Sequence, residues 1–274
     1  MAVLVKWLTR RIVAPVFVGS IPTYRPIKRV IEPSNRWFVF FLKKIIYNKT
    51  KEMNNMKLVL TSSGISNKSI ENELKNIIGE DFKDLKMLFC ITASNYEGGE
   101  MNEWLIKNLE YLKKLGFKID VCDINGIDIE NFLPRFEWAD VFYFEGGNTQ
   151  WLRKCIKDSG LEEYLSKSLD TKVWIGASAG SCVLCPTICN SCQDLFDENI
   201  KGYPTDGLGL VDFQFIPHLN NEWFPKIREV NLKNASKNLK EIDGKKLYIL
   251  DDNSAVFVND KNIKVISEGK WFEM

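Results

Sequence analysis

The sequence predicts an α/β fold, with a mostly parallel sheet flanked by helices on both faces and a small antiparallel edge near the C-terminus. From Met56 onward, short apolar runs alternate with amphipathic stretches, as expected of repeated strand and helix units. The chain has 274 residues, of which 45% are hydrophobic and 12% aromatic, so it can bury the core of such a sheet. We therefore expect one large globular domain.

The elements follow in order along the chain. The first strand begins just after Met56, where Lys-Leu-Val-Leu leads into a polar turn, and Gly116 ends the second helix. The predicted strands are Lys57–Leu60, Lys86–Ala93, Phe117–Cys122, Val141–Phe144, Val173–Ile175, Gln214–Ile216, Lys246–Leu250, Ala255–Val258 and Ile263–Ser267. The predicted helices are Asn67–Ile78, Glu100–Leu115, Gln150–Lys157, Leu161–Ser168, Ser178–Cys185 and Pro225–Leu239.

Residues 1–55 differ chemically from the rest of the chain. The first 50 residues carry ten Lys or Arg and one acid, a balance of +9, whereas residues 51–274 have a balance of −8. Thr9-Arg10-Arg11 before an apolar stretch is weakly similar to an export signal, but Pro15 interrupts that stretch. We expect residues 1–55 to be a basic extension that results from a misassigned start, with a targeting segment as the alternative, and residues 56–274 to be the functional domain.

Composition limits the compartment and the partners. Seven cysteines without a convincing signal peptide favour a reducing compartment, so we expect a cytoplasmic protein. No apolar stretch approaches the roughly 20 residues needed to span a bilayer, and no membrane partner is expected for residues 56–274. The acidic balance of these residues also disfavours nucleic-acid binding. The expected state is a monomer or a homodimer.

A serine directly after a predicted strand is the first candidate for chemistry. Ser178 lies in Gly-Ala-Ser-Ala-Gly at residues 176–180. Gly-x-Ser-x-Gly after a strand is typical of a nucleophile elbow, because small neighbours allow the sharp turn that exposes the serine Oγ. The alternative is an ordinary turn between a strand and a helix.

Two backbone amides could stabilise negative charge near this serine. The helix expected to begin at Ser178 would leave the Ala179 N–H unpaired at its N-terminus. A second amide could come from Gly146 or Gly147, since glycines after a strand let the backbone approach an oxyanion closely. Alternatively this glycine turn only caps the next helix through Asn148 or Thr149.

The single histidine of the chain, His218, lies in Pro-His-Leu-Asn-Asn at residues 217–221, 40 residues after Ser178. A serine hydrolase built on this chain therefore has one possible imidazole base. The alternative is a structural or surface histidine. An acidic side chain would also be needed to fix the tautomer of the imidazole.

Four ordered segments resemble the peptidase E family of α-aspartyl dipeptidases, from Met56 to about residue 260. The segments are Gly-Gly-Asn-Thr at 146–149, Gly-Ala-Ser-Ala-Gly at 176–180, Cys-Pro-Thr-Ile at 185–188 and Pro-His-Leu-Asn-Asn at 217–221. These serine hydrolases have a class-I glutamine-amidotransferase-like, flavodoxin-like fold, and cyanophycinases are related to them. A glutaminase is less favoured, because such amidotransferases use a cysteine where this chain has serine.

The resemblance implies roles for individual residues. It implies Ser178 as the nucleophile, His218 as the general base, and the amides of Gly147 and Ala179 as the oxyanion hole. Asp194 corresponds most nearly to the acid of the family, which follows the Cys-Pro-Thr-Ile segment. The other acidic candidates for this position are Glu198, Asp251 and Asp252.

A small peptide with an N-terminal Asp is the substrate that the resemblance implies, and no cofactor is implied. Arg228 could bind the Asp carboxylate, or it is a solvated helix charge. Glu145 could hold a substrate amine. Gly146, Asn148 and Asn220 complete the candidate substrate-binding residues. The alternatives are a β-aspartyl or cyanophycin-type peptide, another small amide, and a non-catalytic role in binding small molecules.

Four cysteines, Cys182, Cys185, Cys189 and Cys192, have a spacing that could bind zinc or an iron–sulfur cluster. Against a metal, the first pair lies on the helix expected after Ser178, where small buried residues belong, and Cys185 is part of a family motif. We expect no metal and partly buried thiols.

Overall fold

The computed structural model describes residues 16–18, 21–23, 56–79, 81–96, 103–188, 195–231 and 245–274. The chain forms two compact units, Met1–Glu52 and Met53–Met274. In the first unit, strands β1 (Val16–Val18) and β2 (Ile21–Thr23) pair antiparallel. Across the described residues, the helices are too short or too polar to cross a bilayer. The remaining elements belong to the second unit.

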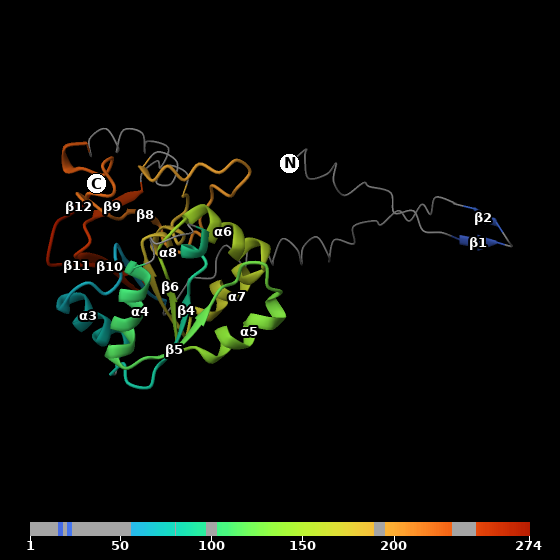
Figure 1. Cartoon of the computed structure of the whole chain (residues 1–274), viewed down its shortest axis with the longest axis horizontal. Helices are drawn as coiled ribbons and strands as arrows, with labels where there is room; N and C mark the ends of the chain where they lie inside the picture. Colours follow the sequence, from blue (N-terminus) through green and yellow to red (C-terminus); the bar gives the residue numbers. More distant parts are fainter. Residues whose placement is uncertain are drawn as a thin grey trace. The chain divides into compact units, whose positions relative to one another are not determined.

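A seven-stranded sheet forms the centre of the second unit (Figure 1). Five strands run parallel in the order β3, β7, β6, β4, β5, and the antiparallel hairpin of β10 and β11 continues the sheet beyond β3. This arrangement confirms the predicted α/β fold with a mostly parallel sheet. The strands are β3 Lys57–Thr61, β4 Lys86–Cys90, β5 Lys118–Cys122, β6 Val141–Phe144, β7 Val173–Ala177, β10 Ser254–Asn259 and β11 Asn262–Ser267.

Helices cover both faces of the sheet because successive strand residues point to opposite sides. Tyr143 and Ile175 belong to the core formed with α3 and α4, whereas Phe144 and Trp174 belong to the core formed with the other helices. The helices on the first face are α3 Lys68–Ile78 and α4 Glu103–Leu115. Those on the second face are α5 Ile129–Trp138, α6 Thr149–Asp158, α7 Leu161–Ser168 and α8 Ala179–Cys182.

A second, three-stranded sheet contains β8 (Phe213–Ile216), β9 (Lys246–Leu250) and β12 (Trp271–Glu273). Strands β8 and β9 are parallel, and β12 is antiparallel to β9. The hairpin of β10 and β11 is the small antiparallel edge that the sequence predicts near the C-terminus. The separate mixed sheet was not predicted, and it supplies two loops to the site.

Three helices differ from the sequence-based expectation. Helix α5 was not expected, and it contains Pro134. Helix α8 was expected to reach Cys185 but ends at Cys182, ahead of Pro186, which lacks the N–H that a continuing helix needs. A helix was expected from Pro225 to Leu239. In the described residues of this stretch, 225–231, the structure has only a short 3₁₀ turn, Glu229–Asn231. Residues 232–239 lie outside the described part of the chain.

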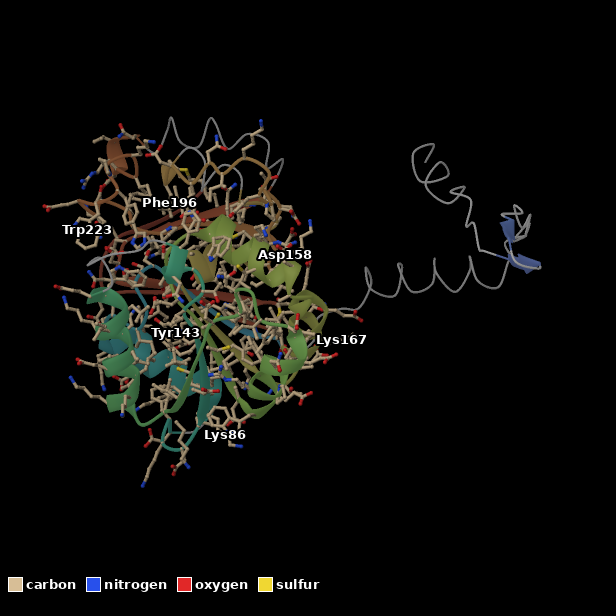
Figure 2. All side chains as sticks on the ribbon, turned by 45° about the vertical axis from the view of Figure 1, so that its right-hand side comes forward. Lys86, Tyr143, Asp158, Lys167, Phe196 and Trp223 are labelled. Atoms are coloured by element: carbon tan, nitrogen blue, oxygen red, sulfur yellow. The ribbon has the colours of Figure 1, made fainter. Side chains whose placement is uncertain are left out.

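The carboxyl ends of the central strands meet at one edge of the sheet, where open α/β sheets bind their ligands. In register, Thr61 of β3 pairs with Ala177 of β7, and Phe144 of β6 pairs with Gly176. Figure 2 shows Lys86, the first residue of β4, at the opposite end of this unit from Phe196 and Trp223. The loops that follow β3, β6 and β7 therefore share one end of the unit.

Candidate active site

The turn after β7 holds Ser178 in a strained conformation. Its φ of 47° and ψ of −107° are rarely adopted by a residue with a side chain. The Ser178 N–H donates to the Thr61 carbonyl at 3.0 Å, and the Ser181 hydroxyl donates to the same carbonyl at 2.9 Å. A Cβ on Gly180 would overlap the Phe144 carbonyl, so the motif needs glycine there for α8 to pack on β6. The turn is thus fixed on both neighbouring strands.

His218 lies in the loop after β8, and its ring faces the serine. Its Nε2 is 2.9 Å from Ser178 Oγ, and its backbone N–H donates to the Ser62 hydroxyl at 3.0 Å. The Phe224 ring stacks on the imidazole, with centroids 4.3 Å apart and planes 11° from parallel. The histidine has a φ of 65° and is 7% exposed. Backbone and ring contacts together hold the imidazole against Ser178.

Asp252 contacts the other ring nitrogen of the histidine. Its Oδ1 is 2.7 Å from His218 Nδ1 and accepts a hydrogen bond from the Ser63 hydroxyl at 2.8 Å. The Asn221 side-chain amide donates to Oδ2. Burial alone would raise the pKa of Asp252, but the hydrogen bonds from His218, Asn221 and Ser63 outweigh it and lower the pKa. The carboxylate is therefore charged at neutral pH and accepts the Nδ1–H of the imidazole.

The other acidic candidates have different surroundings. Glu198 accepts a hydrogen bond at 2.7 Å from the Thr149 N–H, at the start of α6. Asp251 accepts hydrogen bonds from the Ser254 hydroxyl and the Asn253 N–H in the turn before β10. Asp194 lies outside the described residues, so its assignment stays a prediction.

Sequence reasoning ranked Asp252 below Asp194 because the relevant signal is tertiary. Strands β8 and β9 are parallel neighbours, with Ile216 beside Ile249, so the residues after them lie close together. The pairing joins segments about 30 residues apart through a sheet that the sequence did not reveal. Asp252 is the second residue after a predicted strand, Lys246–Leu250, which is the one local sign of its position.

The glycine loop after β6 is held beside the serine. Gly147 has a φ of 127°, and a Cβ there would overlap the Ala93 carbonyl, so a side chain is excluded. The Asn148 N–H donates to Ala93 O at 3.1 Å, and the Ser94 hydroxyl donates to Gly146 O at 2.9 Å.

Two amides beside Ser178 are available as donors. Among the described residues, no group accepts a hydrogen bond from the Gly147 N–H, and Gly147 lines the same pocket as Ser178. Ala179 is the first residue of α8, so its N–H has no carbonyl one turn earlier to accept it. These are the two amides expected from the sequence, and both can bind an oxyanion.

Most of the expected substrate-binding residues have structural contacts instead. The Asn148 side chain caps α6 by accepting the Trp151 N–H at 2.8 Å. Asn220 accepts the Glu229 N–H at 3.0 Å, and Arg228 donates to the Asn220 carbonyl. None of Asn148, Asn220 and Arg228 lines the pocket, whereas Gly146 does.

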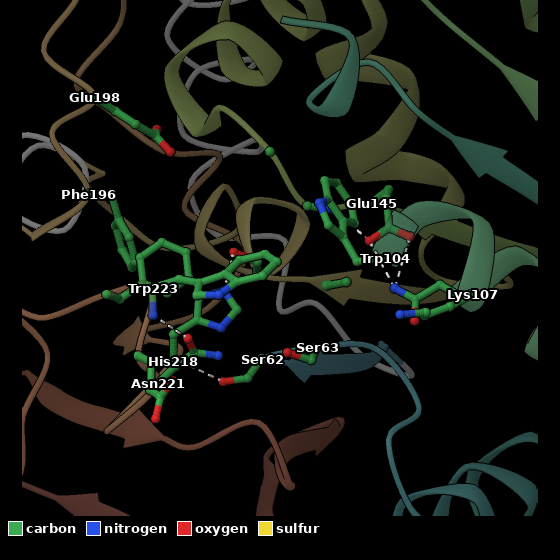
Figure 3. A pocket seen from close by; sticks show the side chains of 17 residues that line it. Ser62, Ser63, Trp104, Lys107, Glu145, Phe196, Glu198, His218, Asn221 and Trp223 are labelled. Carbon is green, nitrogen blue, oxygen red and sulfur yellow. Dashed lines mark hydrogen bonds between the residues drawn. The ribbon is translucent and has the colours of Figure 1, made fainter. Parts of the chain in front are cut away.

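A pocket of about 680 Å³ opens above Ser178 and His218. Trp104, Lys107 and Glu145 lie on one side of it, and Phe196 and Trp223 lie on the other (Figure 3). Among the described residues that line the pocket, Lys107 is the single lysine or arginine, and three residues are acidic: Glu145, Glu198 and Glu222. Sequence reasoning had not included the aromatic residues of this pocket, because they come from separate segments.

Two of the four clustered cysteines lie in the described part of the chain. Cys182 and Cys185 are buried and form no disulfide, and burial raises the pKa of the Cys185 thiol to about 12. Cys189 and Cys192 lie outside the described residues. Within the described ranges, no three His, Cys, Asp or Glu side chains are grouped to bind a metal ion.

Comparisons with known proteins identify a matching family and similar sequences. The sequence model of a family described as "Peptidase family S51" matches residues 58–266. An uncharacterized peptidase of Listeria monocytogenes is 26% identical over 206 residues, which are 69% of this chain and 97% of that protein. A peptidase E of Nostoc sp. is 29% identical over 155 residues, 56% of this chain and 59% of that protein.

Solved structures show the same fold. The crystal structure of a putative peptidase E protein from Listeria monocytogenes superposes with a TM-score of 0.64 at 23% identity, covering 78% of this chain and all of that one. A peptidase from an acI-B1 Actinobacterium has a TM-score of 0.58 at 20% identity, covering 81% of this chain and 92% of that one.

Proposed function

The chain belongs to peptidase family S51, and we propose that it is a serine exopeptidase that hydrolyses small peptides through an acyl-enzyme. The observation that carries the proposal is the contact series from Ser178 Oγ through both nitrogens of His218 to Asp252. The resemblance to peptidase E supports a small peptide as the substrate.

Each group has a step in the proposed reaction. Ser178 Oγ attacks the scissile carbonyl while His218 Nε2 takes its proton and then gives it to the leaving amine. Asp252 holds the Nδ1–H, which keeps Nε2 free to accept that proton and stabilises the imidazolium. The amides of Gly147 and Ala179 stabilise the oxyanion. Water then attacks the acyl-enzyme by the same route, with His218 again as the base.

Selection of an N-terminal Asp, which the family resemblance suggests, has one candidate residue in the described pocket wall. Lys107 could bind the substrate carboxylate, whereas Arg228 does not line the pocket. The Lys107 side chain is 74% exposed and lies 3.4 Å from Glu103. Preference for Asp-Leu over Ala-Leu that is lost in Lys107→Ala would support this specificity, and equal cleavage of the two by the wild type would exclude it.

The experiment is hydrolysis of a dipeptide panel by the full chain. The panel contains Asp-Leu, Glu-Leu, Ala-Leu, Phe-Leu and β-Asp-Leu, with Ser178→Ala as the control. We expect at least one α-linked dipeptide to be cleaved by the wild type and none by Ser178→Ala. Cleavage of β-Asp-Leu alone would instead favour a cyanophycinase-like activity. Failure of well-folded protein to cleave any member would contradict the proposed function.

A further inference from the structure

Glu145 is a buried carboxylate in the pocket wall, and no lysine, arginine or histidine among the described residues pairs with it. It is 1% exposed, and its hydrogen-bond donors within the described structure are the Gly146 N–H at 2.8 Å and the Asn108 side-chain amide at 3.1 and 3.2 Å. Neither donor is charged. Burial raises the pKa of Glu145 to about 7, and the two donors only partly offset this. A buried carboxylate of this kind is costly unless a cation compensates it.

The polar groups around Glu145 have unused hydrogen-bonding capacity. The Tyr143 hydroxyl is fully buried and has no hydrogen-bond partner in the described structure. A Cβ built on Gly64 would lie 2.5 Å from this hydroxyl and 3.1 Å from Asn108 Oδ1, so the two groups lie close together. Asn108 itself lines the pocket beside Glu145. Buried polar groups usually find partners, and Asn108 Oδ1 is a further acceptor in the pocket wall that a donor group of a ligand can use.

The position of Glu145 relative to Ser178 defines which ligand group fits. Its carboxylate bonds the amide of Gly146, and a Cβ on Gly146 would lie 3.2 Å from Ser178 Cβ. Glu145 thus directly precedes the glycine loop, and the next residue of the chain, Gly146, lies against Ser178. In a bound peptide, the α-amino group lies on the carbon adjacent to the scissile carbonyl. The ammonium of a lysine side chain lies instead at the end of a four-carbon stem, which places it farther away.

We propose that Glu145 binds the α-ammonium group of the N-terminal residue of the substrate, and that cleavage therefore requires a free N-terminus. This inference rests on the proposed function, because it takes Ser178 as the point of attack. The ammonium group supplies the cation that the buried carboxylate lacks, and it can also donate to Asn108 Oδ1. The described residues that line the pocket include three acids and one lysine, and this negative balance also favours a positively charged group on the ligand.

The kinetic test compares free and blocked substrates in matched variants of the full chain. For a dipeptide cleaved by the wild type, we expect N-acetylation to lower kcat/KM by about 100-fold. Glu145→Gln keeps the size and an acceptor for the Gly146 N–H, and should lower kcat/KM for the free dipeptide by about 10- to 100-fold, mainly through KM. The matched control Glu110→Gln changes an exposed acid of α4 that does not line the pocket, and it should act within about threefold of the wild type.

Binding without catalysis separates this inference from the proposed function. Calorimetry with Ser178→Ala should show tighter binding of a free dipeptide than of its N-acetyl form, and adding Glu145→Gln should remove the difference. Such binding without hydrolysis by the wild type would retain the ammonium site and reject the peptidase. Equal hydrolysis of free and blocked peptides, or a preference for free peptides that persists in Glu145→Gln, would overturn the ammonium site and retain the peptidase. A preference for N-acetyl-lysyl substrates would also overturn it, because the carboxylate would then bind a side chain.

Discussion

At the scale of single residues, the reactivity of Ser178 depends on the tautomer of His218. Asp252 accepts the Nδ1–H, so Nε2 is left without a proton and can take one from Ser178. Asp252→Asn would present an amide donor or a weaker acceptor to Nδ1 and favour the wrong tautomer. We expect kcat to fall by roughly 10⁴-fold in Asp252→Asn. The measurement is steady-state hydrolysis of the best dipeptide, with Asp194→Asn as the matched variant, which should act like the wild type. The opposite result would assign the acid to Asp194.

Glu145 gives a second prediction at this scale, for stability. Its pKa is about 7 in the folded chain against a reference value of 4.5, so the folded state holds the proton more tightly than the unfolded state. Its contribution to stability is greatest below pH 4.5 and is lost as the pH rises through 7, by at most about 3 kcal/mol. Glu145→Gln should therefore raise the free energy of unfolding at pH 8 and have little effect at pH 4.5. Denaturant unfolding at both pH values measures this, and destabilisation at pH 8 would contradict it.

At the scale of elements, the elbow depends on the close packing of α8 against β6. Gly180→Ala would place a methyl group on the Phe144 carbonyl, and backbone there cannot move without shifting Ser178. We expect destabilisation of about 3 kcal/mol and loss of peptidase activity in the protein that remains folded. Gly202→Ala is the control, since Gly202 has a φ of 86° but no atom near its added Cβ. It should cost about 1 kcal/mol and leave activity unchanged. Thermal unfolding and dipeptide hydrolysis of both variants test this.

Elements that carry local motifs could be predicted from the sequence, and elements defined by pairing could not. Ser178 and the glycine loop were found because each motif follows its own strand directly. The position of Asp252 beside His218 depends on β8 and β9 being parallel neighbours in a separate sheet. Apolar patterning indicates that these segments are strands, but it carries no information on which strands pair. For the same reason the aromatic pocket wall, assembled from α4 and two loops, was not foreseen.

At the scale of the whole molecule, the chemical contrast along the chain predicts a division near residue 55. The +9 balance of the first 50 residues and the strand pattern from Met56 were both visible in the sequence. The structure separates Met1–Glu52 from Met53–Met274 as compact units. All of the described side chains that contact Ser178, His218 and Asp252 belong to the second unit. The candidate active site and the hydrophobic core described here therefore both belong to the unit Met53–Met274.

A protein that begins at Met56 should consequently fold and act like the full chain. Met56 is buried and its carbonyl accepts the Asp260 N–H at 2.9 Å, so this start retains the contacts at the edge of the sheet. We expect the free energy of unfolding to change by less than about 1 kcal/mol and kcat/KM for dipeptides to stay within about threefold. A start at Leu60 is the control, because it removes most of β3, whose Thr61 carbonyl holds the elbow, and it should abolish folding. If the Met56 protein instead folds but loses activity, the basic segment contributes to catalysis and the functional unit is longer than residues 56–274.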